Sequence, residues 1–301
     1  MPFADLLQAL AVVLVWGVNF VVIKWGVADV PPLLLGAMRF TLAAFPALLF
    51  IRKPALPWRW LAAYGLTMGV GQFSLLFTAI KLGMPPGLAS VVLQSQAFFT
   101  LLIAAAWLGE RWQPAQLLGL LCALAGLVLI GIGKGGTLGL IGFALTIAAA
   151  LSWATSNVVV RAIGRAGYRP DPLALVVWAS LIPPLPFLGL SLTFDGADKI
   201  AYTLTHLTGA AVFATCYLAF VATLLGYALW SRLLTRHPAG KVAPFSLLVP
   251  VVGLATAWLV LDERLNGWQA AGSLMLMAGL VLNVFGQRWL ARLGQPVASR
   301  P

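Results

Sequence analysis

The chain has 301 residues, of which 61% are hydrophobic and only 9% are charged. With a mean hydropathy of +0.96, it carries more apolar surface than one globular core could hide, which excludes a soluble domain. The net charge of +11 does not indicate nucleic-acid binding, because the basic residues lie between long apolar runs instead of together on one face. The composition therefore predicts a protein embedded in a lipid bilayer.

Apolar runs of about 20 residues, long enough to cross a bilayer as a helix, follow one another along the chain. The first run has no basic residue ahead of it and no small-residue cleavage site, so we interpret it as a span and not as a signal peptide. We predict ten transmembrane helices, at 6–24, 32–51, 60–80, 87–108, 114–132, 138–160, 173–193, 208–230, 241–261 and 268–287.

Lysine and arginine residues concentrate in alternate connections between the predicted spans. The connections after the second, sixth and eighth spans carry Arg52, Lys53, Arg59, Arg161, Arg165, Arg169, Arg232, Arg236 and Lys241. Such connections stay on the cytoplasmic side of a membrane, so we expect both termini, including a C-terminal tail, to be cytoplasmic.

One stretch of the sequence occurs twice, because Gly240–Gly279 repeats Gly87–Gly126 without a gap. The matching positions include Gly87, Glu110, Gln116, Gly119 and Gly126, which correspond to Gly240, Glu263, Gln269, Gly272 and Gly279. Each copy reads as a long apolar helix, a short hinge and a second apolar helix. We therefore predict two repeats, 1–133 and 134–301, with a polar connection at 194–206 absorbing a shift in register.

Each half has five predicted spans, and an odd number forces the second half to enter the membrane from the opposite side. Glu110 and its counterpart Glu263 should then face opposite compartments. The predicted fold is an all-α polytopic membrane protein with ten transmembrane helices in two inverted five-helix repeats. Inverted repeats around a central site are the physical basis of alternating access, so this organisation favours a secondary transporter.

Neutral polar and aromatic side chains, not acids, occupy the spans. All eight acidic residues lie in termini, connections or helix ends, which leaves no carboxylate for a proton relay at membrane depth. Side chains that share helix faces with other polar or aromatic groups are Trp16, Asn19, Gln72, Gln94, Trp153, Asn157 and Tyr227. Such a lining suits a small zwitterion, with aromatic faces against its ammonium group. Hydrogen bonding between helices is the alternative for the amides, and an interfacial belt is the alternative for Tyr227.

Four further residues are candidates for charge or hinge roles. Arg39 is the only full charge well inside a span, and there it requires carbonyl oxygens, water or an anion. We favour carbonyl oxygens over a substrate carboxylate. Pro250 lies inside the ninth span and should break it. We interpret Glu110 and Glu263 as hinge salt links or helix caps instead of proton carriers.

A resemblance to the EamA family of the drug/metabolite transporter superfamily is carried by VVLVWGVNFVVIKWG, GMPPGLASVVLQSQAFFT and APFSLLVPVVGLATAWLVLDERL. Within that family the chain is similar to bacterial inner-membrane exporters of O-acetylserine and cysteine. The resemblance extends over all ten spans and implies a central cavity between spans 1, 3, 4, 6, 8 and 9. Carried over to this sequence, it implies substrate contacts from Trp16, Asn19, Gln72, Gln94, Trp153, Asn157, Tyr227, Ser246 and Pro250.

The expected function is a secondary active or facilitated transporter that exports small amino-acid-like metabolites, such as cysteine or O-acetylserine, across the bacterial inner membrane. Export and the substrate class follow from the resemblance alone. The expected partners are a zwitterionic metabolite, the lipid bilayer and, if transport is coupled, protons; no cofactor, metal or nucleic acid is expected. The alternative is a multidrug or amphipath efflux transporter of the same superfamily. An intramembrane enzyme is disfavoured, because no His, Asp, Glu or Cys residues converge in the spans.

Overall fold

The computed structural model describes residues 1–133 and 137–293, and in this part of the chain it contains helices and no strand. Ten helical segments of the described chain are long and apolar enough to cross a membrane. They are Phe3–Asp29, Pro32–Leu49, Trp58–Lys81, Pro86–Leu108, Pro114–Ile132, Gly139–Arg165, Pro172–Asp195, Gly209–Arg236, Gly240–Leu261 and Gly267–Gln287. The ten predicted spans are confirmed, while the predicted C-terminal tail beyond residue 293 lies outside the described residues.

Several spans are built from more than one helical element. The elements of residues 1–133 are α1 (Phe3–Asp29), α2 (Pro32–Ala44), η1 (Ala47–Leu49), α3 (Trp58–Tyr64), η2 (Gly65–Gly71), α4 (Gln72–Lys81), α5 (Pro86–Val92), η3 (Leu93–Ser95), α6 (Gln96–Leu108) and α7 (Pro114–Ile132). Those that follow are α8 (Thr137–Arg165), α9 (Pro172–Ala179), α10 (Pro184–Asp195), α11 (Ala197–Thr205), α12 (Gly209–Cys216), η4 (Tyr217–Leu225), α13 (Gly226–Arg236), α14 (Ala239–Val242), η5 (Ala243–Leu248), α15 (Val249–Leu261) and α16 (Gly267–Leu293).

The breaks inside spans fall at corresponding places in the two halves of the chain. The third and eighth spans each contain a π-helical segment, η2 and η4. The fourth and ninth spans each contain a 3₁₀ segment, η3 and η5. The predicted break in the ninth span is confirmed, and Pro250 lies in the first turn of α15, where its missing N–H leaves no helical hydrogen bond unmade.

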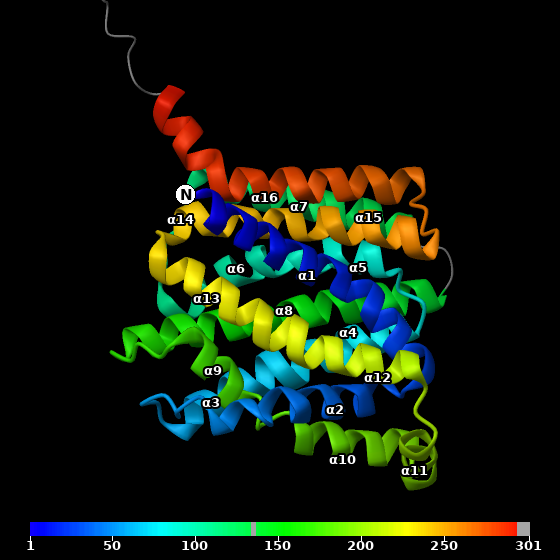
Figure 1. The fold of residues 1–301 in the computed structure, drawn as a ribbon. Coiled ribbons are helices and arrows are strands. Elements are labelled where there is room, and N and C mark those ends of the chain that lie inside the picture. Colours follow the sequence, from blue (N-terminus) through cyan, green and yellow to red (C-terminus); the bar gives the residue numbers. More distant parts are fainter. Residues whose placement is uncertain (134–136, 294–301) are drawn as a thin grey trace, which may run out of the picture.

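The connection between the seventh and eighth spans holds a helix that was not predicted. The connection 194–206, expected to be a polar linker, contains the helix α11. This short helix lies beside α10 at the edge of the molecule (Figure 1). It buries Ile200 and Thr203 on one side and leaves Tyr202 exposed on the other, so its mixed composition reflects an amphipathic helix.

The helices run side by side along the molecule, and α7 and α16 form one outer edge (Figure 1). These two helices cross antiparallel at glycines: Gly119 meets the backbone of Gly279, and Gly126 meets that of Gly272. Small residues allow membrane helices to approach until their backbones touch. The outward face of α7 exposes Leu118, and apolar side chains cover the outside of the bundle as well as its core.

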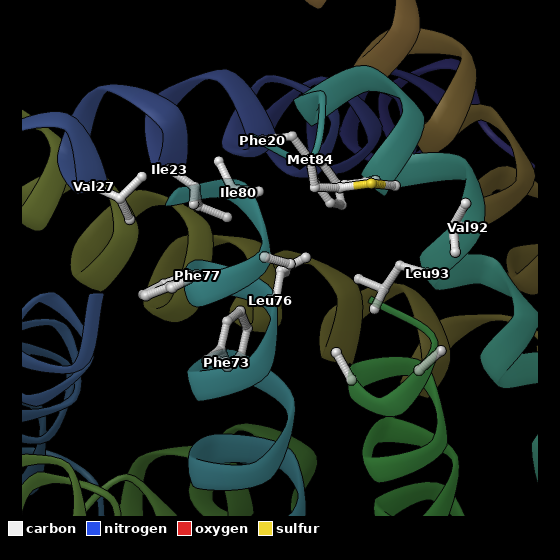
Figure 2. Close-up of a cluster of buried hydrophobic side chains, with 14 of the residues drawn as sticks. Phe20, Ile23, Val27, Phe73, Leu76, Phe77, Ile80, Met84, Val92 and Leu93 are labelled. Carbon is white, nitrogen blue, oxygen red and sulfur yellow. The ribbon is translucent and has the colours of Figure 1, made fainter. Parts of the chain in front are cut away.

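The largest buried cluster joins the C-terminal part of α1 to α4 and the start of the fourth span (Figure 2). Its labelled members are Phe20, Ile23, Val27, Phe73, Leu76, Phe77, Ile80, Met84, Val92 and Leu93. Phe73 and Phe77 stack edge to face with ring centroids 5.4 Å apart. This packing fixes α1 and α4, two of the helices that carry the polar residues described next.

Candidate functional site

A cavity of about 380 Å³ lies between the helices at the middle of the bundle. Eight of the nine predicted substrate-contacting residues line it: Trp16, Asn19, Gln72, Gln94, Trp153, Asn157, Tyr227 and Ser246. They come from the six spans that the sequence implicated, and α2 adds Arg39. The volume of this cavity falls within the range of small-molecule sites in proteins.

Pro250 is the predicted contact that does not line this cavity. It is buried where α15 packs against α5, and its carbonyl oxygen accepts a long hydrogen bond of 3.5 Å from Ser90 Oγ. Its placement supports a role in helix packing. Ser90 itself reaches the cavity wall beside it.

The lining residues outside the predicted set include Tyr64, Met68 and Gln96. Tyr64 and Gln96 are polar-ended residues inside spans, a signal that the sequence did carry. Met68 is apolar, so the sequence carried no such signal for it. It belongs to the π-helical segment η2, whose wider turn changes which side chains face inward.

Asn19 and Gln72 present unpaired oxygens. Asn19 is 9% exposed and Gln72 is 3% exposed, yet neither Asn19 Oδ1 nor Gln72 Oε1 has a hydrogen-bond partner within residues 1–133 and 137–293. Buried polar atoms without a partner are rare in folded proteins, because each one forfeits its interaction with water. These two oxygens are therefore available to a donor that enters the cavity.

Asn157 is in a different situation, because its amide already bridges two helices. Its Nδ2 donates to Gln96 Oε1 at 2.7 Å and to Thr100 Oγ1 at 3.2 Å, which links α8 to α6. Gln94 Nε2 makes only a long contact of 3.5 Å with the carbonyl oxygen of Ser246. Hydrogen bonding between helices, the alternative for the amides, thus describes Asn157 better than it describes Asn19.

Arg39 is 3% exposed and lines the cavity wall from α2. Its Nη2 donates to Thr223 Oγ1 at 3.0 Å, and its guanidinium carbon lies 3.9 Å from the ring centroid of Phe73. The expectation that carbonyl oxygens would satisfy this side chain is wrong, because Nε and Nη1 have no hydrogen-bond partner. A small void of about 20 Å³, roughly the space of one water molecule, lies beside it.

Thr223 can hold Arg39 because η4 is π-helical. Thr223 Oγ1 donates to the carbonyl oxygen of Leu218, five residues earlier, and thereby has a lone pair free for the arginine. Single-turn π segments inside helices occur frequently at functional sites. The segments η2 and η4 approach the guanidinium from two sides, since residues of both line the small void.

Aromatic rings form the part of the cavity nearest α13. Trp16 lies with its ring centroid 5.4 Å from that of Tyr227 and 5.4 Å from that of Trp230. Its indole Nε1 donates to the carbonyl oxygen of Ala222 at 3.0 Å, which fixes the orientation of the ring. Tyr227 thus belongs to the cavity wall, and not to a belt at the membrane interface.

A second cavity of about 560 Å³ adjoins the first and shares Tyr64, Gln96 and Asn157 with it. It extends between α6 and α8 as far as Arg161. Beyond it the Glu110 carboxylate pairs with Arg161 at 2.5 Å and with Arg165 at 3.1 Å. We call this region the Glu110 end; the second cavity lies between it and the central cavity.

The opposite region, which we call the Glu263 end, is closed. The Glu263 carboxylate accepts hydrogen bonds from the backbone N–H groups of Gly87 and Leu88 at 2.8 and 2.9 Å. A Cβ on Gly87 would lie 2.9 Å from that of Ala257, so α5 and α15 pack tightly beside this cap. The expected salt link or cap is therefore a salt link at Glu110 and a cap at Glu263.

Comparisons with known proteins agree with this architecture. A protein of Salmonella typhimurium named "Probable amino-acid metabolite efflux pump" is 52% identical over 282 residues, covering 93% of this chain and 94% of the relative. The Escherichia coli protein of the same name is 49% identical, covering 95% of this chain and 96% of the relative. A "Probable terminal-alkyne amino-acid exporter" of Streptantibioticus cattleyicolor is 25% identical, with 90% of each chain covered.

Among solved structures, a protein crystal structure matches with a TM-score of 0.64 and covers 98% of this chain and 99% of the other. At 22% identity, that likeness shows the fold alone. The model of the EamA-like transporter family matches residues 4–132 and 140–285, which together contain every residue that lines the central cavity. With ten apolar spans and two close relatives named as efflux pumps, the chain belongs to the EamA-like transporter family and is a membrane transporter, not an enzyme.

Proposed function

We propose that this protein exports small amino-acid-like metabolites, such as cysteine and O-acetylserine, across the bacterial inner membrane. The observation that carries the proposal is the central cavity, whose wall combines neutral amides, aromatic rings and one arginine. The names of the Salmonella typhimurium and Escherichia coli relatives support an amino-acid metabolite as cargo. Amide and hydroxyl groups suit a compact polar molecule better than a bulky lipophilic one.

Two inverted repeats, 1–133 and 134–301, support alternating access as the mechanism. The family model matches the chain in two segments, and corresponding glycines of α7 and α16 meet antiparallel. In the observed conformation the Glu263 end is closed and the Glu110 end is open. Since the two halves share one plan, exchange of their conformations would close the Glu110 end and open the other.

The basic connections place the Glu110 end in the cytoplasm under this proposal, together with both termini. The second cavity, between α6 and α8, then receives substrate from inside the cell. Arg161 and Arg165 lie at its mouth, where their positive charge attracts the carboxylate of an incoming amino acid. Closure at the Glu263 end keeps the site from leaking into the other compartment during loading.

The proposal is tested by reconstituting the full chain in vesicles preloaded with radiolabelled O-acetylserine or cysteine. We expect efflux well above that of protein-free vesicles, and exchange of label when unlabelled substrate is added outside. Matched vesicles containing an unrelated transporter control for leakage. Equal loss of label from all three kinds of vesicle would refute an exporter of these metabolites.

Multidrug or amphipath efflux is the second candidate, favoured by the rings of Trp16, Tyr227 and Trp230. Against it stands the buried guanidinium of Arg39 in the same wall, because a lipophilic cation would meet a like charge there. Competition of O-acetylserine efflux by lipophilic cations separates the two. We expect no competition.

A further inference from the structure

We propose that Arg39 binds the substrate carboxylate, that Asn19 and Gln72 receive the substrate ammonium group, and that the cavity thereby selects zwitterions. This inference rests on the proposed function and assigns the polarity of the same site. It differs from the sequence interpretation, which favoured a structural role for the arginine.

The argument for a carboxylate begins with the unpaired donors of Arg39. Nε and Nη1 of the guanidinium both lack a hydrogen-bond partner among the described residues. A charged group at 3% exposure requires compensation, yet its side-chain hydrogen bond within the described part of the chain goes to the neutral hydroxyl of Thr223. A carboxylate can accept two parallel N–H groups, one from Nε or Nη1 and the other from the second N–H of Nη2, which is the strongest geometry available to this side chain.

No acid of the described chain competes for that position. The residues that line the central cavity include no aspartate or glutamate, and those of the void beside the guanidinium include none either. The ring of Phe73 and the hydroxyl of Thr223, and not a counter-ion, hold the arginine in place. Its charge is therefore available to an anionic group that arrives through the cavity.

The argument for an ammonium group rests on acceptors of the opposite character in the same wall. Asn19 Oδ1 and Gln72 Oε1 are unpaired and buried, and both residues line the cavity together with Arg39. An ammonium group has three N–H donors and no acceptor, so two amide oxygens and an aromatic face can satisfy it. Trp16, three residues before Asn19 on α1, supplies such a face.

The cavity thus contains unpaired N–H donors on Arg39 and unpaired oxygen acceptors on Asn19 and Gln72. A zwitterion can satisfy both sets, because its carboxylate accepts from the donors and its ammonium group donates to the acceptors. A carboxylic acid lacking the ammonium group would leave two oxygens unpaired. An amine or ester lacking the carboxylate would leave a buried guanidinium unpaired. A site built to hydrogen-bond a group rejects analogues that lack it, because its own buried groups then remain unsatisfied.

The test compares ligands that differ by one charge. Vesicles containing the full chain exchange radiolabelled O-acetylserine in the presence of unlabelled O-acetylserine, its methyl ester or N-acetylserine. We expect the ester, which lacks the carboxylate, and N-acetylserine, which lacks the ammonium group, to compete at least tenfold more weakly. Equal competition by all three would overturn the assignment while leaving transport itself established, whereas absence of any exchange would refute the proposed function.

Variants then assign each charge to its residue. Arg39→Gln should lower competition by O-acetylserine about tenfold and leave the ester unaffected, so that discrimination between them is lost. Asn19→Leu should likewise lower competition by O-acetylserine and leave N-acetylserine unaffected, so that discrimination between these two is lost. Arg232→Gln removes the same charge from an exposed position on α13 and should behave as wild type. Unchanged discrimination in Arg39→Gln would overturn the inference; if that variant does not fold, Arg39→Lys must still exclude the ester but bind O-acetylserine more weakly.

Discussion

Gly126 of α7 lies directly against Gly272 of α16, so that a Cβ on Gly126 would stand 2.6 Å from the carbonyl oxygen of Gly272. Gly119 has the corresponding relationship with Gly279, at the same 2.6 Å. In the sequence repeat Gly119 corresponds to Gly272 and Gly126 to Gly279. Each glycine thus meets the counterpart of the other, which is the arrangement expected at a two-fold axis between inverted halves.

Replacing Gly126 with alanine should destabilise the protein. The added Cβ collides with the backbone of α16 and not with a flexible side chain, so the helices must separate at a cost of about 1–3 kcal/mol. Gly189→Ala, in the middle of α10 with nothing within 4 Å of its Cβ, is the matched control and should be neutral or slightly stabilising. Thermal unfolding in detergent measures both; equal melting temperatures would contradict the close contact.

The sequence sufficed to locate the spans because their signal is local: a run of apolar residues long enough for a bilayer predicts a helix wherever it occurs. It also indicated eight residues of the cavity wall, since polar residues such as Asn19 and Gln72 are costly among apolar ones and must face inward. Composition failed at α11, where mixed polar and apolar residues read as a linker. The helix is recognised only by the burial of Ile200 against the bundle.

The partners of Arg39 could not be predicted, because they depend on contacts between distant segments. Phe73 lies in the next span, and Thr223 is 184 residues away. The side chain meets both only because π-helical turns in η2 and η4 shift the register of two spans. No composition or spacing in a single span reveals such a turn. A related reason applies to Pro250. The sequence indicated that the ninth span is broken near this residue, but it did not show which face of the broken helix points toward the cavity.

Asn157 and Asn19 should respond differently to substitution by leucine. Asn157→Leu removes the hydrogen bonds to Gln96 and Thr100 that join α8 to α6, and should cost about 1 kcal/mol of stability. Asn19→Leu removes an oxygen without a partner, so stability should be unchanged or higher while O-acetylserine exchange falls. Melting temperature and exchange rate, measured on the same samples, separate the two. A loss of melting temperature in Asn19→Leu would show that its amide is structural.

An imposed pH gradient should not drive accumulation of substrate. The described residues that line the two cavities include no carboxylate and no histidine, so no side chain there can carry a proton between the ends of the path. We expect O-acetylserine flux in vesicles to follow its own gradient at equal rates with and without a pH difference. Uphill accumulation that collapses with a proton ionophore would contradict this and require a proton site elsewhere.

Glu263 and Glu110 correspond in the sequence, but their removal should have unequal effects. Glu263→Ala deprives the backbone N–H groups of Gly87 and Leu88 of their acceptor and removes a negative charge from the start of α5. Loss of such a cap costs about 1 kcal/mol, enough to shift a balanced equilibrium between open and closed ends several-fold. Glu110→Ala breaks only ion pairs with partly exposed arginines, which contribute little.

The shift is measured by labelling a cysteine at Ser246, a cavity residue, after Cys122 and Cys216 have been replaced by alanine. An impermeant maleimide is added from the Glu263 side of sealed, oriented vesicles. Ser246→Cys should label slowly in the otherwise unaltered chain, because the cap and the α5–α15 contact block that side, and several-fold faster with Glu263→Ala. Glu110→Ala is the matched control and should not accelerate labelling from this side. Equal rates in the two variants would show that the Glu263 cap does not hold the closed end.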